Sequence, residues 1–127
     1  MEKPKVLIVD DAATVLQFQK FVLEKEGYEI LTATNGQEGF DAALSHKPAI
    51  VLLDIMMPVM DGIECCRLLR GNPNTKEIPI IMVTTRSEVD KVEAAKEAGC
   101  TDYVFKPVNP QLLKTKIKQY LQNGSKV

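Results

Sequence analysis

Five short, mainly apolar runs separated by segments of helical periodicity constrain this fold more than any other feature. The runs are Lys5–Val9, Glu29–Ala33, Ala49–Leu53, Ile80–Val83 and Asp102–Phe105. Ala49–Leu53 is apolar throughout, as expected of a strand that is covered on both faces. Strands that alternate with helices favour right-handed crossovers and a parallel sheet. The sequence therefore predicts five βα units that form one parallel sheet with helices on both faces.

The first three segments between these runs carry helix signals. Apolar residues at helical spacing predict a helix over about Ala13–Glu26. Val15, Phe18 and Val22 lie on one face, Leu16 and Leu23 lie beside it, and Gly27 ends the helix at the C′ position. Two further helices are predicted from N-cap signals, in which a polar residue precedes a glutamate by three positions. These pairs are Asn35 with Glu38, for a helix to about His46, and Asp61 with Glu64, for a helix to about Arg70.

The remaining helices complete the pattern. Ser87 with Asp90 predicts the start of a helix that stops at Gly99, and Asn109-Pro110 predicts a cap followed by proline at the first helical position. We expect one domain over residues 1–122 and a flexible tail over 123–127. The chain is therefore expected to act alone or to be a piece of a longer protein.

Composition excludes several classes of function. The chain has 127 residues, of which 45% are apolar and 26% charged, as in an ordinary globular domain. The formal net charge is −1 and no basic stripe is present, so direct nucleic-acid binding has little support. No apolar run is long enough to predict a membrane span.

The three cysteines do not have the spacing of a disulfide framework or a metal site. Cys65 and Cys66 are adjacent, and Cys100 leaves an odd number. The simplest interpretation is that they are small, buried or half-buried thiols in a reducing cytosol, with no role of their own. We therefore expect a cytoplasmic protein.

Polar side chains stand at or just beyond the C-terminal ends of four of the runs. Asp10 and Asp11 follow the first run, Asp54 the third, Thr84 the fourth and Lys106 the fifth. In open parallel sheets, ligands bind beyond the carboxyl ends of the strands. If these strands are neighbours, three carboxylates, a hydroxyl and an ammonium share one pocket. That group suits a divalent cation and a phosphoryl group carried on an aspartate.

Charge repulsion gives the three carboxylates a reason to bind a cation. Two like charges about 4 Å apart repel by roughly 4 kcal/mol at an effective dielectric constant near 20. Mg²⁺ takes few carboxylates and keeps several waters, so we expect Mg²⁺, with Mn²⁺ as an alternative. A simpler alternative is that Asp10 and Asp11 cap the following helix and that Asp54 is an ordinary acid at a strand end.

Five motifs follow one another along nearly the whole chain. They are Ile8-Val9-Asp10-Asp11, Leu52-Leu53-Asp54-Ile55-Met56-Met57-Pro58-Val59-Met60-Asp61-Gly62, Met82-Val83-Thr84-Thr85, Ala98-Gly99-Cys100-Thr101-Asp102-Tyr103 and Phe105-Lys106-Pro107. In this order and at this spacing, they resemble the receiver domain of response regulators in two-component signalling, of the single-domain chemotaxis-regulator type. The resemblance implies a flavodoxin-like (βα)5 fold with strand order 2-1-3-4-5.

The resemblance implies a role for each matching residue. Asp54 is similar to the phosphoacceptor, whose carboxylate attacks a phosphohistidine on a partner and becomes an aspartyl phosphate. Asp11 and Asp54 would bind Mg²⁺ directly, together with the backbone carbonyl of Met56, and Asp10 would help through water. Lys106 would supply a positive charge to a phosphoryl oxygen.

The same resemblance implies a switch formed by Thr84 and Tyr103. The Thr84 hydroxyl would donate to a phosphoryl oxygen on Asp54 and draw the following loop inward. Tyr103 would then turn into the vacated space from an exposed rotamer, which would reshape the surface of the fourth helix, fifth strand and fifth helix. Lys106-Pro107 resembles the family's cis peptide.

The resemblance also implies partners. A sensor histidine kinase or a histidine phosphotransfer protein would be the donor, and a downstream protein would read the reshaped surface. The domain would not be an enzyme acting on other molecules, but would catalyse its own phosphorylation and dephosphorylation. Met56 and Arg86, each two residues after a site residue, are expected to flank the path of water. Because the apolar Met56 cannot orient water, we expect slow to moderate dephosphorylation.

Three other functions are compatible with parts of the pattern. A haloacid-dehalogenase-type phosphatase needs a second aspartate two residues after the first, where this chain has Ala12 and Ala13. A flavodoxin-type flavin carrier needs a hydroxyl- and glycine-rich phosphate loop, whereas Asp10 and Asp11 would repel a phosphate. A receiver-like module that binds a partner without being phosphorylated stays open.

Overall fold

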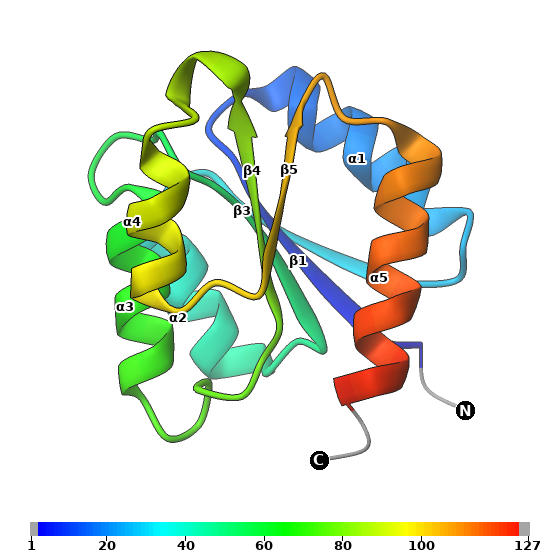
Figure 1. Cartoon of the computed structure of the whole chain (residues 1–127). Helices are drawn as coiled ribbons and strands as arrows, with labels where there is room; N and C mark the ends of the chain where they lie inside the picture. Colours follow the sequence, from blue (N-terminus) through cyan, green and yellow to red (C-terminus); the bar gives the residue numbers. More distant parts are fainter. Residues whose placement is uncertain (1–2, 125–127) are drawn as a thin grey trace.

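Five parallel strands form one sheet between two layers of helices in the computed structural model, which describes residues 3–124 (Figure 1). The sheet has the order β2-β1-β3-β4-β5, and every neighbouring pair is parallel. The predicted strand order and fold class are therefore confirmed. The strands are β1 (Lys5–Val9), β2 (Glu29–Ala33), β3 (Ile50–Asp54), β4 (Ile80–Thr85) and β5 (Asp102–Lys106).

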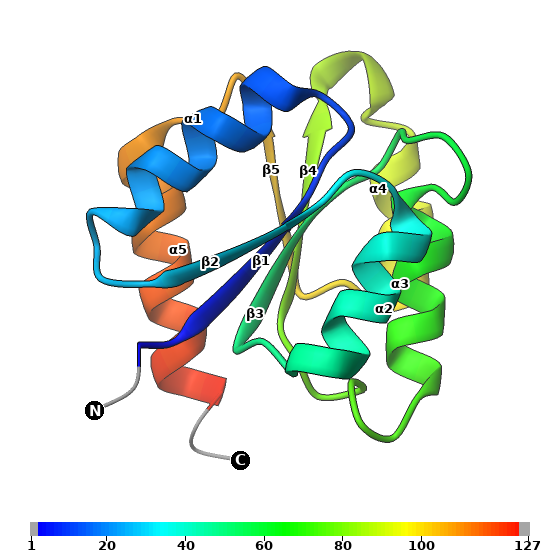
Figure 2. The same ribbon diagram turned by 180° about the vertical axis from the view of Figure 1, so that it is seen from behind.

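The helices divide between the two faces of the sheet. Helices α1 (Ala13–Glu24) and α5 (Pro110–Gly124) cover one face. Helices α2 (Gly36–His46), α3 (Gly62–Gly71) and α4 (Lys91–Ala98) cover the other, as the two opposite views show (Figures 1 and 2). A short 3-10 helix, η1 (Arg86–Glu88), connects β4 to α4.

Two hydrophobic cores lie on the two faces of the sheet, because side chains of a strand alternate between faces. In β3, Ile50 and Leu52 pack with α1 and α5, whereas Val51 and Leu53 pack with α2, α3 and α4. All four side chains are fully buried, and each stabilises the fold by roughly 1.5–3 kcal/mol. The cores therefore fix the position of the strand that ends in Asp54.

The buried face of α1 differs from the prediction. Leu16, Gln19 and Leu23 lie at positions i, i+3 and i+7 and are buried together with Val22, whereas Phe18 is 47% exposed. Phe18 precedes Gln19 by one residue and so points about 100° away around the helix.

Helix α1 also ends earlier than predicted. It stops at Glu24, and the N–H groups of Glu26 and Gly27 donate to the carbonyls three residues before them. A tighter last turn of this kind satisfies carbonyls that the helix itself leaves free. Gly27 therefore lies one residue beyond its predicted place in the cap.

The predicted N-caps of α2 and α3 are present. The Asn35 side chain accepts a hydrogen bond from the Glu38 N–H at 2.9 Å, and the Asp61 carboxylate accepts one from the Glu64 N–H at 2.9 Å. The Glu38 carboxylate accepts from the Thr34 N–H at 2.9 Å and from its hydroxyl at 2.7 Å. Local capping chemistry therefore starts both helices where the sequence predicts.

The predicted start of the fourth helix is wrong. Helix α4 begins only at Lys91, and the Asp90 side chain makes no capping hydrogen bond. Ser87 and Glu88 instead belong to η1, where their side chains contact the Thr85 hydroxyl at 2.8 and 3.1 Å. The Ser87 side chain, which resembles a cap in the sequence, is therefore used within the loop between β4 and α4.

Three strands and the last helix extend beyond their predicted ends. Asp54, Thr84 and Lys106 lie inside β3, β4 and β5, because Asp54 pairs with Val83 and Thr85 pairs with Lys106 in the sheet. Helix α5 continues to Gly124, so the predicted tail from residue 123 begins as helix. Residues 125–127 of that tail lie outside the described part of the chain.

Candidate functional site

Three carboxylates meet at the carboxyl end of the central strands β1 and β3. The pairing of Val9 with Leu53 places Asp10 beside Asp54, at the edge from which α1 leaves. One oxygen of each of Asp10, Asp11 and Asp54 lies within 4.8 Å of the others. Asp10 and Asp54 are only 2% and 4% exposed, whereas Asp11 is exposed. The predicted acidic cluster is thus assembled.

Lys106 reaches the two buried acids from the end of β5. Its Nζ lies 3.0 Å from an Asp10 oxygen and 3.3 Å from an Asp54 oxygen. The Lys106–Pro107 peptide bond is cis. Since β5 is an edge strand, the lysine side chain crosses the end of β4 to reach the acids of β1 and β3.

The acids carry more charge than the lysine can balance. Three carboxylates (−3) and one ammonium (+1) leave a formal charge of −2. Burial and the charge of Asp10 raise the pKa of Asp54 to about 6, although Lys106 opposes the change. Burial lowers the pKa of Lys106, but its hydrogen bonds and charge contacts with Asp10 and Asp54 outweigh this and raise it.

The donor set fits a hard divalent cation. Carboxylate oxygens are the ligands that Mg²⁺ and Mn²⁺ prefer, and a charge of +2 would neutralise the cluster. The capping alternative is not supported, because Ala12 is the N-cap of α1 and no side-chain hydrogen bond caps the helix there. One Asp10 oxygen accepts from the Ala12 N–H at 2.9 Å, and the other faces Lys106.

The loop after Asp54 is held by two close backbone approaches. The Gly62 N–H donates to the Ile55 carbonyl at 2.8 Å, and the Gly36 N–H donates to the Met60 carbonyl at 3.0 Å. A Cβ at Gly62 would overlap the Asp54 carbonyl, and one at Gly36 would overlap the Met60 carbonyl. Only glycine permits these contacts, which fix the loop beside the acids.

The Met56 side chain in this loop is 48% exposed. The role of its backbone carbonyl as a metal ligand stays a prediction, and so does its influence on dephosphorylation.

Thr84 is fully buried at the end of β4, and its hydroxyl is already engaged. It lies 3.2 Å from an oxygen of Glu88, which also accepts from the Thr85 hydroxyl at 3.1 Å. Sequence reasoning missed Glu88. Its spacing, four residues after Thr84 and three after Thr85, is the available signal, because a single turn after the strand brings such residues together.

Tyr103 and Arg86 lie on the surface formed by α4 and β5. Tyr103 is half-buried, because its ring packs edge-to-face on Phe105 at 5.5 Å and against the core under α3 and α4, and its turn from an exposed rotamer stays a prediction. The Lys96 ammonium lies 5.6 Å from the Tyr103 ring, and the Arg86 guanidinium lies 4.7 Å from the Phe105 ring. Arg86 thus contacts β5, and its effect on attacking water stays a prediction.

The three cysteines are free thiols. Cys65 and Cys66 are fully buried in α3, and burial raises their pKa values to about 12 and about 11. Cys100 is half-buried, and burial raises its pKa as well. Such thiols are mostly protonated at neutral pH and are poor nucleophiles.

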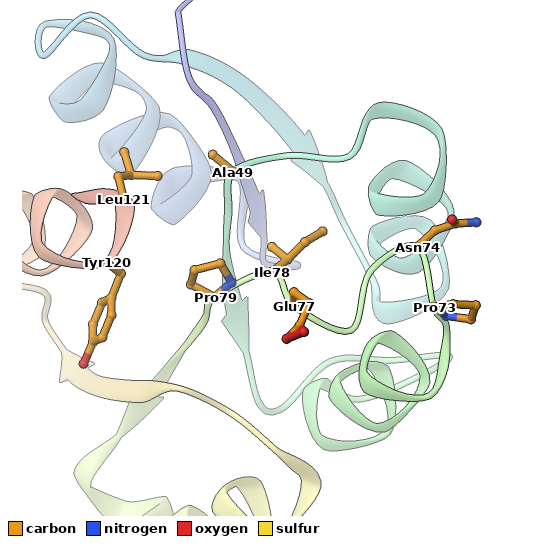
Figure 3. A pocket seen from close by; sticks show the side chains of 8 residues that line it. All are labelled: Ala49, Pro73, Asn74, Glu77, Ile78, Pro79, Tyr120 and Leu121. Carbon is orange, nitrogen blue, oxygen red and sulfur yellow. The ribbon is translucent and has the colours of Figure 1, made fainter. Parts of the chain in front are cut away.

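Two grooves lie at opposite ends of the molecule. One, of about 260 Å³, lies beside the site and is lined by Thr14, Val15, Phe18, Gln19, Lys106, Pro107 and Val108. Figure 3 shows the other, of about 410 Å³, at the amino ends of β3 and β4, far along the strands from the acids. Its lining residues are Ala49, Pro73, Asn74, Glu77, Ile78, Pro79, Tyr120 and Leu121.

In the described part of the chain, no helix has the length and apolar character needed to cross a membrane.

Known proteins resemble this chain over almost its full length. A family profile described as the response regulator receiver domain matches residues 6–118. The chain is 37% identical over 121 residues to the alkaline phosphatase synthesis transcriptional regulatory protein PhoP of Bacillus subtilis. The matched residues make up 94% of this chain and 49% of PhoP. The chain thus spans about half the length of the curated relatives it matches.

Solved structures agree with this result. A putative response regulator from Chloroflexus aurantiacus is 35% identical, with a TM-score of 0.91 and coverage of 95% of this chain and 99% of that one. A CheY-like response regulator receiver domain protein from Methanospirillum hungatei is 33% identical, with a TM-score of 0.91 and coverage of 98% of both chains. Neither the phosphatase nor the flavin-carrier alternative is supported by these matches, and the chain belongs to the response regulator receiver domain family of two-component signalling.

Proposed function

We propose that this domain accepts a phosphoryl group on Asp54 and transmits the change through the surface of α4, β5 and α5. The observation that carries the proposal is the contact of a buried Asp54 carboxylate with the Lys106 ammonium at 3.3 Å, inside a cluster of three acids. The acid offers a nucleophile, and the lysine offers a positive charge to the oxygens of an incoming phosphoryl group.

The proposed reaction exchanges one bond for another. A carboxylate oxygen of Asp54 attacks the phosphorus of a phosphohistidine, a P–O bond forms, and the P–N bond breaks with its electron pair leaving on the imidazole. Lys106, which contacts both Asp10 and Asp54, would donate to the transferred oxygens. Asp11, Asp54 and the Met56 carbonyl would hold Mg²⁺, with Asp10 acting through water. When bound, the cation offsets charge on the phosphoryl group.

The family supports a protein donor and a protein target. We infer that a histidine kinase or a histidine phosphotransfer protein supplies the phosphoryl group. Curated relatives such as PhoP of Bacillus subtilis are named as transcriptional regulators and are about twice the length of this chain. We propose that residues 1–122 act as the receiver unit, with output through contact with another protein or domain.

A small phosphodonor tests the chemistry without a partner. We expect that incubation with Mg²⁺ and acetyl phosphate, followed by intact mass measurement, adds one phosphoryl group. Asp54→Asn should abolish the gain, because an amide cannot attack phosphorus. Asp41→Asn, which changes the same charge at an exposed position of α2, should leave uptake unchanged. Uptake that survives in Asp54→Asn would show that another residue is the acceptor.

A protein donor tests the partner. Lys106 and the exposed Phe18 of α1 line the same groove beside the acids, and we propose that a phosphohistidine approaches the site along it. Phe18→Ser should therefore slow transfer from a phosphorylated histidine phosphotransfer domain and leave uptake from acetyl phosphate unchanged. If the chain takes a phosphoryl group from neither donor, it is a receiver-like binding module.

A further inference from the structure

The hydroxyl group of Thr84 is held by a residue that the proposed reaction does not use. Thr84 is fully buried, and its hydroxyl donates to the Glu88 carboxylate at 3.2 Å. The same Glu88 oxygen accepts the Thr85 hydroxyl at 3.1 Å, and the Thr85 oxygen lies 2.8 Å from the Ser87 hydroxyl. Glu88 thus links the end of β4 to η1 through two adjacent threonines.

A hydroxyl group carries one proton and can make one strong donation at a time. If Thr84 donates to Glu88, it cannot also donate to a phosphoryl oxygen on Asp54. The carbonyl of Thr85 is a weaker alternative acceptor, at 3.4 Å. Because Thr84 is buried, solvent does not readily replace a lost partner. The carboxylate and the phosphoryl group would therefore compete for the same proton.

We propose that Glu88 is a positioning residue that holds the Thr84 hydroxyl in the unphosphorylated state and so sets how readily a phosphoryl group on Asp54 engages it. This inference rests on the proposed function. A carboxylate is a stronger acceptor than a neutral oxygen, so the contact stabilises the unphosphorylated arrangement. Occupation of Asp54 would have to break it before Thr84 could turn.

The contact between Thr84 and Glu88 lies close to the surface of α4, β5 and α5, so its release would affect that surface. Glu88 lies in η1, a helix of three residues, and Arg86 of the same helix lies 4.7 Å from the Phe105 ring in β5. Phe105 in turn packs on Tyr103. A rearrangement of η1 after Thr84 leaves Glu88 would therefore reach the two aromatic side chains of β5.

The test is an equilibrium titration of the whole chain with the phosphoryl analogue beryllofluoride in the presence of Mg²⁺, followed by the backbone amide signals. Removing a contact that exists only in the unbound arrangement must tighten binding by the same free energy. Glu88→Ala should lower the Kd by about three- to tenfold, within the range for the net contribution of one typical hydrogen bond. Glu88→Gln, which keeps the shape and loses the charge, should give a smaller shift in the same direction.

Two comparisons separate positioning from a general effect of charge or folding. Glu93→Ala removes the same charge from an exposed position of α4 and should leave the Kd unchanged. In a Thr84→Ala background, Glu88→Ala should no longer tighten binding, because the proton over which the acceptors compete is gone. Thermal melts identify any variant that does not fold, and Glu88→Gln carries the test if Glu88→Ala unfolds.

The outcomes distinguish this inference from the function on which it rests. If wild-type protein binds beryllofluoride but Glu88→Ala and Glu88→Gln bind no more tightly, the inference is wrong and the proposed function stands. If the gain persists without the Thr84 hydroxyl, Glu88 acts by another route and the inference is again wrong. If wild-type protein neither binds the analogue nor takes up a phosphoryl group, both fail.

Discussion

Val59, in the loop between Asp54 and α3, has a backbone conformation that β-branched residues rarely adopt. Its φ is +69°, and the Met60 N–H donates to the Pro58 carbonyl at 2.7 Å, which closes a tight γ-turn around it. The side chain is 82% exposed and so gains little from burial. A positive φ of this kind at a non-glycine residue costs on the order of 1–3 kcal/mol. The strain lies next to the acidic cluster, in a loop that Gly36 and Gly62 hold in place.

A substitution that tolerates this conformation should stabilise the protein. Asn enters the left-handed region more easily than Val, so Val59→Asn should raise the free energy of unfolding by about 1 kcal/mol. Urea denaturation measures the change. The matched control is Val89→Asn, at a residue that is 56% exposed with an ordinary φ of −59°. If both variants change stability equally, the Val59 backbone does not store strain.

Single residues also show what the sequence could predict about the site. The acids, Thr84 and Lys106 could be found because each follows an apolar run, and parallel strands bring their carboxyl ends together. The partner of the Thr84 hydroxyl could not be found in this way. Glu88 takes that role through side-chain geometry in a three-residue turn, which neither periodicity nor propensity describes.

At the scale of elements, Asp102 joins the edge strand β5 to helix α5. Its carboxylate accepts hydrogen bonds from the Lys116 ammonium at 2.6 Å, the Tyr120 hydroxyl at 2.6 Å and the Tyr103 N–H at 2.7 Å. Burial alone would raise the pKa of Asp102, but these hydrogen bonds outweigh it and lower the pKa. The bond with Asp102 also raises the pKa of Tyr120 to about 12.

Removal of this charge should weaken the contact between β5 and α5. Asp102→Asn should lower the free energy of unfolding by roughly 1.5–3 kcal/mol near pH 7, the range for hydrogen bonds to a charged group. A carboxyl group with a lowered pKa stabilises the fold above its unfolded value and loses this contribution as pH falls through the folded value. The difference between wild type and variant should therefore shrink below about pH 4.

The control for Asp102→Asn is Asp90→Asn, because the exposed Asp90 side chain makes no capping hydrogen bond at the start of α4. It should leave stability nearly unchanged at both pH values. Chemical denaturation at each pH measures both variants. A constant difference between wild type and Asp102→Asn from neutral to acid pH would contradict the ionic character of the contact.

The ends of helices were predicted well where a local capping side chain determines them. The predictions were less accurate where tertiary contacts determine the end or the buried face of a helix. The caps at Asn35, Asp61 and Asn109 form as predicted, because each side chain accepts N–H groups two or three residues on. The predicted start of α4 was wrong because the Ser87 hydroxyl contacts Thr85 in the loop and the Asp90 side chain makes no capping hydrogen bond. The predicted apolar face of α1 was only partly right: Val22 is buried, but Phe18 is exposed because the sheet buries the stripe through Leu16 and Leu23.

At the scale of the whole molecule, two apolar cores stabilise the fold, whereas the acidic cluster destabilises it because like charges are buried close together. The sheet places fully buried residues of β1 and β3 directly before Asp10 and Asp54, so the acids are forced into proximity by the packing beneath them. The cluster keeps a formal charge of −2 after Lys106 is counted. Stability and chemistry are therefore opposed at this end of the molecule.

That opposition predicts how stability responds to the metal. In EDTA, Asp54→Asn should be more stable than wild type by on the order of 1–2 kcal/mol, because it removes a buried charge beside Asp10. Mg²⁺ at ten times its Kd should stabilise wild type by about 1.4 kcal/mol and the variant by much less. Asp41→Asn, an exposed charge on α2, should follow wild type in both conditions.

Thermal melts of the three proteins with EDTA and with Mg²⁺ measure these differences. Differences between Asp54→Asn and wild type can be attributed to the charge at Asp54. An isosteric amide leaves unchanged the packing of β1 and β3 that holds the acids together. Asp54→Asn could instead be less stable than wild type without metal. In that case the ion pair of Asp54 with Lys106 stabilises the fold by more than burial of the carboxylate and its repulsion by Asp10 destabilise it. The acids would then stabilise the apo fold, and cation binding would not be needed to offset their charge.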